Sequence, residues 1–255
     1  MNKGIGIAGI AGRMGRLLAE EVVAAGLTLA GGIDREATAP AGVRLFADIG
    51  ALAAAADVVI DFTHASAVAG HAAALAQAGT AWVLGTTGLS AADDAAVARA
   101  AERIGVVQAP NFSPGVNLVL ALAERMAAAL PGDAYDAEIV EMHHRQKVDA
   151  PSGTALGLGE AVARGRGVRL DAVRESGRDG HTGPRKPGAI GFAALRGGQV
   201  VGEHTLIFAA AGEHIALTHR AFDRRVFATG AVRAARWVAG RPAGRYSMMD
   251  VLGMA

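Results

Sequence analysis

Cysteine is absent from the 255-residue sequence. Disulfide bonds, thiolate nucleophiles, iron–sulfur clusters and cysteine-ligated zinc sites are therefore excluded. A reducing compartment suits such a chain. The N-terminal residues also lack the apolar core and cleavage site of a signal peptide, because Gly4, Gly6 and Gly9 interrupt their apolar run. We therefore expect a cytoplasmic protein.

A charge excess of either sign is missing as well. Lys and Arg total 25 against 24 Asp and Glu, a formal net charge of +1, and the chain has no run of Lys or Arg. This pattern offers no basic surface to nucleic acid or to an anionic membrane. No apolar stretch reaches the ~18 residues of a membrane-spanning helix. We expect neither nucleic acid nor a membrane as a partner.

Aromatic residues make up only 4% of the chain, whereas glycine is abundant, with 35 residues. The hydrophobic share of 51% and the charged share of 19% exclude a disordered chain. At about 150 residues per domain, the length predicts one or two domains. Many glycines and alanines among short apolar runs indicate tight loops between closely packed helices and strands.

Short apolar runs typical of buried strands alternate with helical segments over the first half of the chain. We expect strands at residues 5–8, 27–33, 57–62, 81–84 and 106–108. We expect helices at 14–24, 65–77 and 91–103, with an alanine-rich segment at 49–56. This alternation predicts βαβ units and a doubly wound, Rossmann-like parallel sheet that helices cover on both faces.

The rhythm changes after Ser113, where we place a domain boundary. A helix is expected at 116–130, a strand at 137–143, a short helix from Thr154, a loop at 177–188 and a last helix at 226–238. Strands are expected at 190–195, 199–202, 205–210 and 215–218. Because short turns join these strands, we expect antiparallel neighbours in a second, mixed and largely antiparallel sheet of an α+β domain.

A glycine-rich loop follows the first strand and opens the first helix. Gly9, Gly12 and Gly15 have the spacing G-x-x-G-x-x-G, a variant of the dinucleotide-binding fingerprint, and Asp34 ends the second strand. The helix N-terminus offers N–H groups to phosphates, and the carboxylate suits a ribose 2′-hydroxyl. Arg35 suits a 2′-phosphate instead, so the pair favours tolerance of both NADH and NADPH. A glycine turn without a ligand is the alternative.

Two further loops lie at the carboxyl ends of predicted strands, where ligands bind in open α/β sheets. One is Gly85-Thr86-Thr87-Gly88 and the other is Ala109-Pro110-Asn111-Phe112. Small residues there let the backbone approach a nicotinamide ring. Ordinary strand-to-helix turns would explain the same residues.

The densest group of chemically active residues follows the strand at 137–143. His143, His144, Arg145 and Lys147 form a cationic group, and residues 152–154 (Ser-Gly-Thr) open a helix. Cations beside a helix N-terminus suit a small anionic substrate, with histidine available for proton transfer. A solvated charged face and a plain Ser152 N-cap are alternatives. A metal site is disfavoured because adjacent strand residues point to opposite faces and no third ligand is suitably spaced.

Residues 143–155 read H-H-R-x-K-x-D-A-P-S-G-T-A, which resembles the signature of the 4-hydroxy-tetrahydrodipicolinate reductase family, also called dihydrodipicolinate reductase. Shorter matches follow the order of the family along essentially the whole chain. They lie at 12–15, 61–63, 85–88, 111–113, 180–183, 202–205 and 250–252.

The resemblance implies reduction of 4-hydroxy-tetrahydrodipicolinate, a small dicarboxylate, to tetrahydrodipicolinate with loss of water. The reductant is NADH or NADPH, no metal takes part, and the step belongs to lysine and diaminopimelate biosynthesis. His143 is then a proton donor and acceptor and Lys147 a proton donor. Substrate binding falls to His144, Ser152, Gly153 and Thr154. Cofactor binding falls to Gly9, Ile10, Ala11, Gly12, Arg13, Met14, Asp34, Arg35, Gly85, Thr86, Thr87, Ala109, Pro110, Asn111 and Phe112.

The resemblance also implies the organisation of the chain. We expect a dinucleotide-binding domain at 1–113, to which 224–255 returns, and a substrate-binding and oligomerisation domain at 114–223. The family forms homotetramers through the sheet of that second domain. Two positions depart from the family pattern, because Asp34 replaces a frequent Glu and Pro110 removes a backbone N–H donor. A reductase of another small anionic imine or keto acid, or a non-catalytic dinucleotide sensor, are the alternatives.

Overall fold

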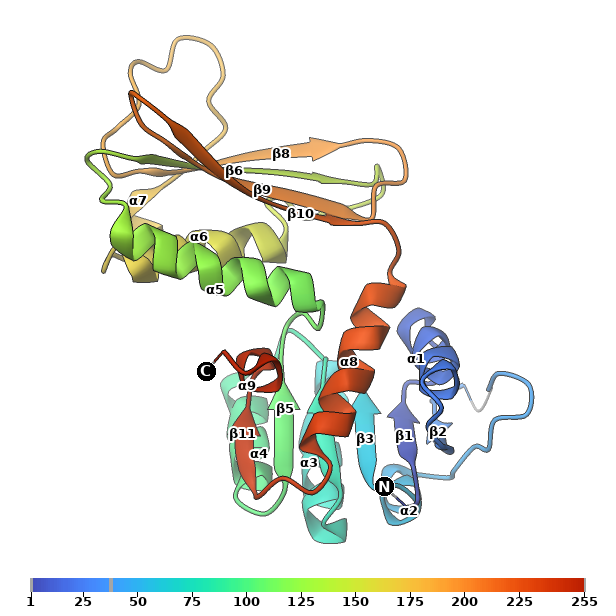
Figure 1. Ribbon diagram of the computed structural model, residues 1–255. Coiled ribbons are helices and arrows are strands. Elements are labelled where there is room, and N and C mark those ends of the chain that lie inside the picture. The colour runs from blue at the N-terminus through green and yellow to red at the C-terminus, as the bar shows by residue number, and fades with distance from the viewer. Residues whose placement is uncertain (1, 37–38, 255) are drawn as a thin grey trace. The chain divides into compact units, whose positions relative to one another are not determined.

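The computed structural model describes residues 2–36 and 39–254 (Figure 1). Contacts divide the chain into two compact units. The first unit comprises Met1–Pro114 with Arg225–Ala255, and the second comprises Gly115–Arg224. Each unit has its own sheet and its own apolar core.

Within the described residues, the first unit has a six-stranded sheet in the order β11-β5-β4-β3-β1-β2 with parallel pairing throughout. The strands are β1 (Ile5–Ala8), β2 (Leu29–Ile33), β3 (Val58–Asp61), β4 (Ala81–Leu84), β5 (Gly105–Gln108) and β11 (Gly244–Tyr246). The helices are α1 (Arg13–Ala24), α2 (Ile49–Ala55), α3 (Ala65–Ala78), α4 (Ala91–Ala101), α8 (Arg225–Val238) and α9 (Met248–Leu252).

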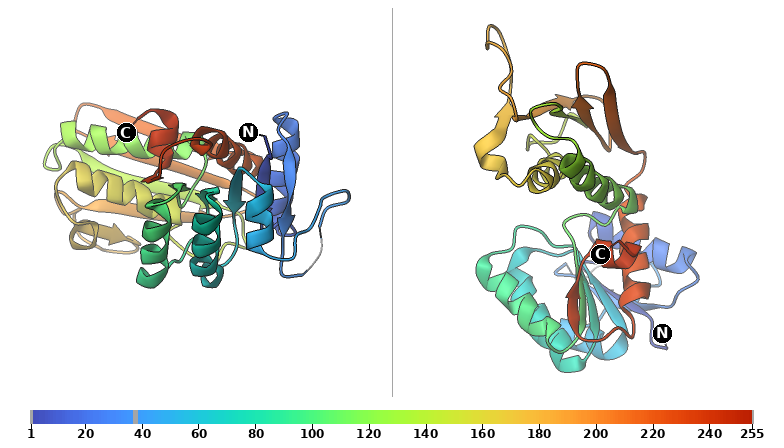
Figure 2. Two further views of the ribbon diagram at one scale, coloured as in Figure 1. Left: turned by 90° about the horizontal axis from the view of Figure 1, so that it is seen from below. Right: turned by 60° about the vertical axis from the view of Figure 1, so that its left-hand side comes forward.

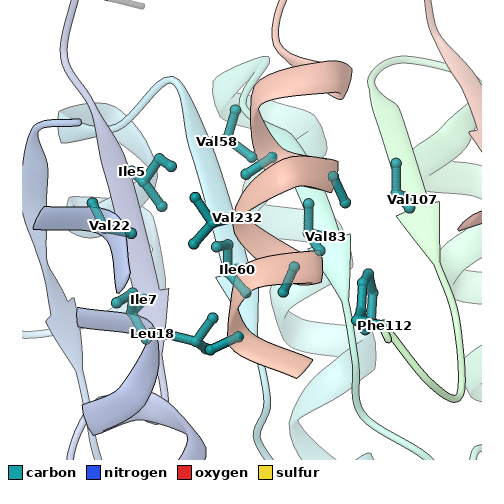
Figure 3. Packing of buried hydrophobic residues seen from close by; sticks show 14 of the residues in the cluster. Ile5, Ile7, Leu18, Val22, Val58, Ile60, Val83, Val107, Phe112 and Val232 are labelled. Carbon is teal, nitrogen blue, oxygen red and sulfur yellow. The ribbon is translucent and has the colours of Figure 1, made fainter. Parts of the chain in front are cut away.

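Helices cover both faces of this sheet. On one face, α1, α8 and α9 pack on Ile7, Ile60 and their neighbours, and Figure 3 shows Val232 of α8 over the central strands. On the other face, α2, α3 and α4 pack on Val59, Trp82 and further side chains of alternating position. Burial on both faces explains why the central strands are apolar at successive positions. The predicted doubly wound parallel sheet is confirmed.

The second unit has a mixed sheet, and its strands in the described part of the chain follow the order β10-β9-β6-β8-β7. These are β6 (Asp136–His143), β7 (Arg174–Ser176), β8 (Ile190–Arg196), β9 (Gly202–Ala209) and β10 (His214–Ala221). The helices are α5 (Pro114–Ala129), α6 (Gly153–Gly165) and α7 (Leu170–Val173). Figure 2 shows α5 and α6 side by side against one face of the sheet, where Ile139 and Phe208 lie in the core.

Two expectations about this sheet were wrong. Residues 199–201 lie in the connection between β8 and β9 rather than in a strand, and β9 is a single strand that begins at Gly202. In addition, β8 and β9 are not neighbours despite their short connection, because β6 lies between them, parallel to β8 and antiparallel to β9. The connection passes the end of β6, where the Gly197 N–H donates to the His143 carbonyl at 2.9 Å. Hydrogen bonds to β6 therefore replace those of the expected hairpin.

Candidate functional site

The glycine loop of the first unit is shaped by close backbone packing. Gly9 follows β1 with φ +84°, and Gly12 is the N-cap of α1. A methyl group on Gly15 would lie 2.1 Å from the carbonyl oxygen of Gly9. The third glycine therefore lets α1 approach the loop closely, and Gly12 has no side chain to bond the N–H groups of the first helical turn. Such a terminus suits a phosphate.

The carboxylate of Asp34 is tied to this loop. Its Oδ2 accepts the Ala11 N–H at 2.9 Å and its Oδ1 accepts the Glu36 N–H at 3.2 Å. A cavity of about 590 Å³ opens beside the carboxylate. Among the predicted cofactor residues, those that line it are Gly9, Ala11, Gly12, Asp34 and Arg35.

Other predicted cofactor residues lie elsewhere. Ile10 is fully buried in the core, Met14 packs against that core, and Arg13 is exposed. Ala109 and Phe112 are buried, whereas Thr87 and Pro110 are exposed. The side chain of Asn111 accepts the Ser113 N–H at 2.8 Å. Because the Ile10 side chain is buried in the core, only its backbone could contact a ligand.

Asp61 is a buried carboxylate at the carboxyl end of β3, and the sequence analysis assigned it no role. Asp61, at the end of β3, accepts hydrogen bonds from Thr63 Oγ1 at 2.6 Å and from His71 Nδ1 of α3 at 2.7 Å. Thr86 Oγ1 lies 3.5 Å from the same carboxylate and accepts the Thr63 N–H at 3.1 Å. A methyl group on Gly85 would meet the Phe62 ring at 2.4 Å. The predicted Gly85-Thr86 segment is thus joined to the wall of the cavity.

In the second unit, the titratable side chains near the end of β6 lie on the buried face of the strand. Burial alternates along the strand, and Glu141 and His143 continue the inward row that begins with Ala137 and Ile139. His143 Nδ1 donates to Glu141 Oε2 at 2.6 Å. Arg196 of β8 binds both oxygens of Glu141, at 2.8 and 2.9 Å. A charged network therefore takes the place of apolar packing at this end of the strand.

Ser152 and His204 extend the network. The Ser152 N–H donates to Glu141 at 3.1 Å, and Ser152 Oγ caps α6 by accepting the Ala155 N–H at 3.2 Å. The same Oγ lies 2.9 Å from His204 Nε2, and the His204 ring meets the His143 ring edge-on at 5.0 Å between centroids. The N-cap role that the sequence indicated for Ser152 accounts for its contact with Ala155, and not for those with Glu141 and His204.

Burial sets the protonation of both imidazoles. It lowers the pKa of His143, which outweighs the opposite effect of Glu141. Burial and the neighbouring His143 lower the pKa of His204 to about 4. Burial alone would raise the pKa of Glu141, but hydrogen bonds from Arg196, His143 and the Ser152 amide hold it below its ordinary value. At neutral pH the site therefore holds a carboxylate between neutral imidazoles and cations.

The remaining predicted residues lie on the turn after β6 and at the start of α6. Lys147 Nζ donates to both oxygens of Asp149, at 2.7 and 2.8 Å. His144 Nε2 lies 3.4 Å from an Arg224 guanidinium nitrogen. Gly153 is exposed and Thr154 half-buried in the first turn of α6.

Sequence reasoning missed several members of this group. Glu141, Arg196, His204 and Arg224 were given no role, and Arg196 lies 55 residues from the carboxylate it binds. The spacing of Glu141 and His143 offered a signal, because residues two apart on a strand share a face. The match at 202–205 includes His204 but did not place it beside His143, and Arg196 on β8 had no signal, because the proximity of both depends on the sheet order.

Two other kinds of feature are absent from the described residues. Over residues 2–36 and 39–254, no three His, Asp or Glu side chains are placed to hold a metal ion. Over the same ranges, no helix combines the length and the apolar character that a bilayer crossing requires.

Comparisons with known proteins agree with the family resemblance. Residues 3–112 match the family described as dihydrodipicolinate reductase, N-terminus, and residues 115–252 match its C-terminus. A relative from Granulibacter bethesdensis named 4-hydroxy-tetrahydrodipicolinate reductase is 71% identical, covering 98% of this chain and 97% of its own. One of the same name from Acidiphilium cryptum is 65% identical with the same coverage.

Solved structures share the fold of this chain. Dipicolinate-bound dihydrodipicolinate reductase from Paenisporosarcina sp. TG-14 has a TM-score of 0.79 at 25% identity, covering 96% of this chain and 97% of that one. A probable dehydrogenase from Thermotoga maritima shares the fold, with a TM-score of 0.61 at 14% identity. The chain therefore belongs to the 4-hydroxy-tetrahydrodipicolinate reductase family, as its motif at 143–155 predicts.

Proposed function

We propose that this chain reduces 4-hydroxy-tetrahydrodipicolinate to tetrahydrodipicolinate with loss of water, in lysine and diaminopimelate biosynthesis. The reductant is NADH or NADPH. The observation that carries the proposal is the group of side chains after β6 within one unit, where His143 is bonded to Glu141, Lys147 lies on the following turn and Ser152 caps α6. The relatives that share this chain over nearly its whole length bear the name of the same reaction.

The first unit supplies the dinucleotide site. The Gly9–Gly12 turn and the N-terminus of α1 suit the pyrophosphate, because the backbone there is uncovered by side chains. When bound, the dinucleotide supplies the hydride. We assign the ribose next to the adenine to Asp34, which lines the same cavity. Arg35 beside it suits a 2′-phosphate, so both NADH and NADPH are accepted.

The second unit supplies the dicarboxylate site. His144 and Arg224 lie within 3.4 Å of one another, and Lys147 is on the same connecting turn. Ser152 caps the third N–H of α6, so the positive end of the helix dipole lies at Gly153 and Thr154. We assign one substrate carboxylate to the Gly153–Thr154 turn and the other to the cations.

Proton transfer falls to His143 and Lys147. Loss of water takes the hydroxyl group away with a proton and removes a proton from the neighbouring ring carbon, which leaves a conjugated imine. Hydride addition to a ring carbon of that imine then places negative charge on the ring nitrogen, which needs a proton. His143 presents Nε2, because its Nδ1 is bonded to Glu141. Lys147 presents its ammonium group on the turn after β6, where Asp149 holds it. Lys147 can give the nitrogen its proton directly, and His143 can do so after Nε2 has taken the proton that leaves the ring carbon.

We also propose a cytoplasmic homotetramer. The sheet face of the second unit opposite α5 and α6 carries Leu195, which is 52% exposed, and the Thr205–Thr218 cross-strand pair. A mixed face of this kind, with an exposed leucine among polar side chains, suits self-association. Sedimentation velocity tests the assembly, and a Leu195→Glu variant is expected to sediment as a smaller species.

A coupled assay tests the proposed reaction. The substrate is made freshly from pyruvate and aspartate semialdehyde by the synthase of the preceding step, and nicotinamide absorbance is followed with NADH and with NADPH. Absorbance loss that requires this protein supports the proposal. Binding of NADH without any loss would favour a dinucleotide sensor, and turnover with another imine or keto acid alone would favour a related reductase.

A further inference from the structure

The Glu141 carboxylate accepts four hydrogen bonds in the second unit's site, yet it neither gives nor takes a proton in the transfers described above. It is 1% exposed. Its Oε1 accepts from Arg196 Nη2 at 2.9 Å and from the Ser152 N–H at 3.1 Å. Its Oε2 accepts from Arg196 Nη1 at 2.8 Å and from His143 Nδ1 at 2.6 Å. One buried group therefore contacts the proton-transfer histidine and the N-cap of the substrate-binding helix.

Arg196 adds a connection to the intervening loop. Besides both Glu141 oxygens, its Nη2 donates to the Asp149 carbonyl at 2.7 Å. Asp149 is the residue whose side chain holds Lys147. The pair thus links β6, β8 and residues 149–152 through charged hydrogen bonds. A buried carboxylate is costly unless such partners satisfy it. Loss of Glu141 would leave the Ser152 N–H without this acceptor and Arg196 with backbone carbonyls alone.

The bond to Glu141 also decides which nitrogen of His143 carries hydrogen. An ionised carboxylate only accepts hydrogen bonds, so the nitrogen that faces it must be the donor. Nδ1 is then protonated in the neutral ring, and Nε2 is the nitrogen that exchanges a proton. A methyl group on Gly202 would lie 3.0 Å from Nε2, so the glycine keeps that side of the ring open.

We propose that Glu141, held by Arg196, is a positioning residue that sets the tautomer of His143 and the placement of the Ser152–Thr154 turn together. The inference rests on the proposed function, because it assigns His143 and this turn to one reaction. Glu141 would then couple proton transfer to carboxylate binding, as buried carboxylates behind catalytic histidines do.

The charged groups around His143 determine the direction in which its pKa should change when Glu141 is replaced. The groups that face it are Glu141 on its own strand, Lys147 on the turn, Arg196 on β8 and His204 on β9. Glu141 raises the pKa of His143, whereas Lys147 and Arg196 lower it. Removal of the Glu141 charge should therefore move the proton loss of His143 to lower pH.

Glu141→Gln tests the proposal, with Glu138→Gln as its matched control. Glu138 is on the same strand and also binds arginines, Arg178 and Arg185, but on the other face. We expect Glu141→Gln to lower kcat about tenfold to hundredfold, to raise KM for the dicarboxylate, and to shift the pH limb of His143 downward. Glu138→Gln should keep the pH limb of the wild type. An unchanged limb and kcat in Glu141→Gln, or the same change in both variants, would overturn the proposal.

A measurement on the unaltered protein decides the matter if Glu141→Gln does not fold. Nitrogen-15 NMR of labelled histidines reports the tautomer of each neutral ring, and a His143→Asn sample assigns the signal. Hydrogen on Nδ1 of His143 supports the proposal, whereas hydrogen on Nε2 overturns it. Wild-type turnover is a separate result, so failure of the proposed reaction is distinguishable from failure of this inference.

Discussion

Asp34 Oδ2 accepts a hydrogen bond from the backbone N–H of Ala11 at 2.9 Å. The residue expected to read the ribose is therefore also a support of the glycine loop. Its second oxygen accepts the Glu36 N–H, so both oxygens have backbone partners. Ribose hydroxyls would share these oxygens, each of which can accept more than one hydrogen bond.

Replacement of Asp34 by alanine should weaken NADH binding more than NADPH binding. The carboxylate accepts from a 2′-hydroxyl but repels a 2′-phosphate, so its loss costs NADH a hydrogen bond and relieves NADPH of repulsion. Fluorescence titration of both dinucleotides gives the two Kd values. Arg35→Ala provides the control of opposite sign, because it should weaken NADPH more. Equal losses for both dinucleotides in Asp34→Ala would mean that the carboxylate does not read the 2′ position.

Gly15→Ala should destabilise the first unit. The added methyl would lie 2.1 Å from the Gly9 carbonyl oxygen and 2.6 Å from Ile10 Cα, so backbone must move. We expect the free energy of unfolding to fall by about 1–3 kcal/mol, with weaker dinucleotide binding. Gly70→Ala on α3 is the matched control, because no atom lies within 4 Å of its new methyl and alanine favours a helix. Urea unfolding measures the free energy of unfolding of both variants. An unchanged value in Gly15→Ala would refute the close-packing role.

Lys147→Ala should lower kcat far more than it weakens dinucleotide binding. The ammonium lies in the second unit, bonded to Asp149, and not in the cavity that includes Asp34. Stopped-flow turnover and NADH titration separate the two effects. Lys186→Ala, at an exposed lysine of the 177–189 loop, should leave both unchanged. Near-normal turnover of Lys147→Ala would remove this residue from the proton transfer.

His204 should make stability depend on pH. Its pKa is about 4 in the folded chain and ordinarily 6.5, so below pH 6.5 the unfolded chain binds a proton that the folded chain does not. The free energy of unfolding should therefore fall as pH drops from 6.5 to 4, by on the order of 2 kcal/mol from this group. His204→Gln should lose that part of the slope, whereas His214→Gln, at an exposed histidine, should retain it. Urea unfolding at pH 7 and at pH 4.5 gives the change in the free energy of unfolding for each protein. An equal change in the wild type and in His204→Gln would contradict the buried neutral imidazole.

The fold of the first unit was predictable because its strands are buried on both faces. Ile5–Ala8 and Ala81–Leu84 are therefore apolar at every position, and both strands have their predicted bounds. Gly244–Tyr246 carries no such pattern, since this short edge strand depends on pairing with β5. The place of β6 between β8 and β9 was equally hidden, because connection length alone does not specify which strands pair.

The residues of the site also fall into those that the sequence predicts and those that it does not. Motifs that are local in sequence, such as the glycine loop and the run from His143 to Thr154, could be found from spacing. Contacts such as that of Glu141 with Arg196 could not, because they join strands whose order the sequence does not reveal. His71 was missed for a related reason, since only the folded chain brings α3 against the buried end of β3.

Transfer of deuterium from NADH deuterated at nicotinamide C4 tests the reduction most directly. Separate samples labelled on either face of the ring are incubated with freshly made 4-hydroxy-tetrahydrodipicolinate and the protein, and the product is analysed by mass spectrometry. We predict that one of the two samples yields tetrahydrodipicolinate carrying one deuterium, together with unlabelled NAD. Unlabelled product from both samples, or no product while NADH remains bound, would contradict the proposed reaction.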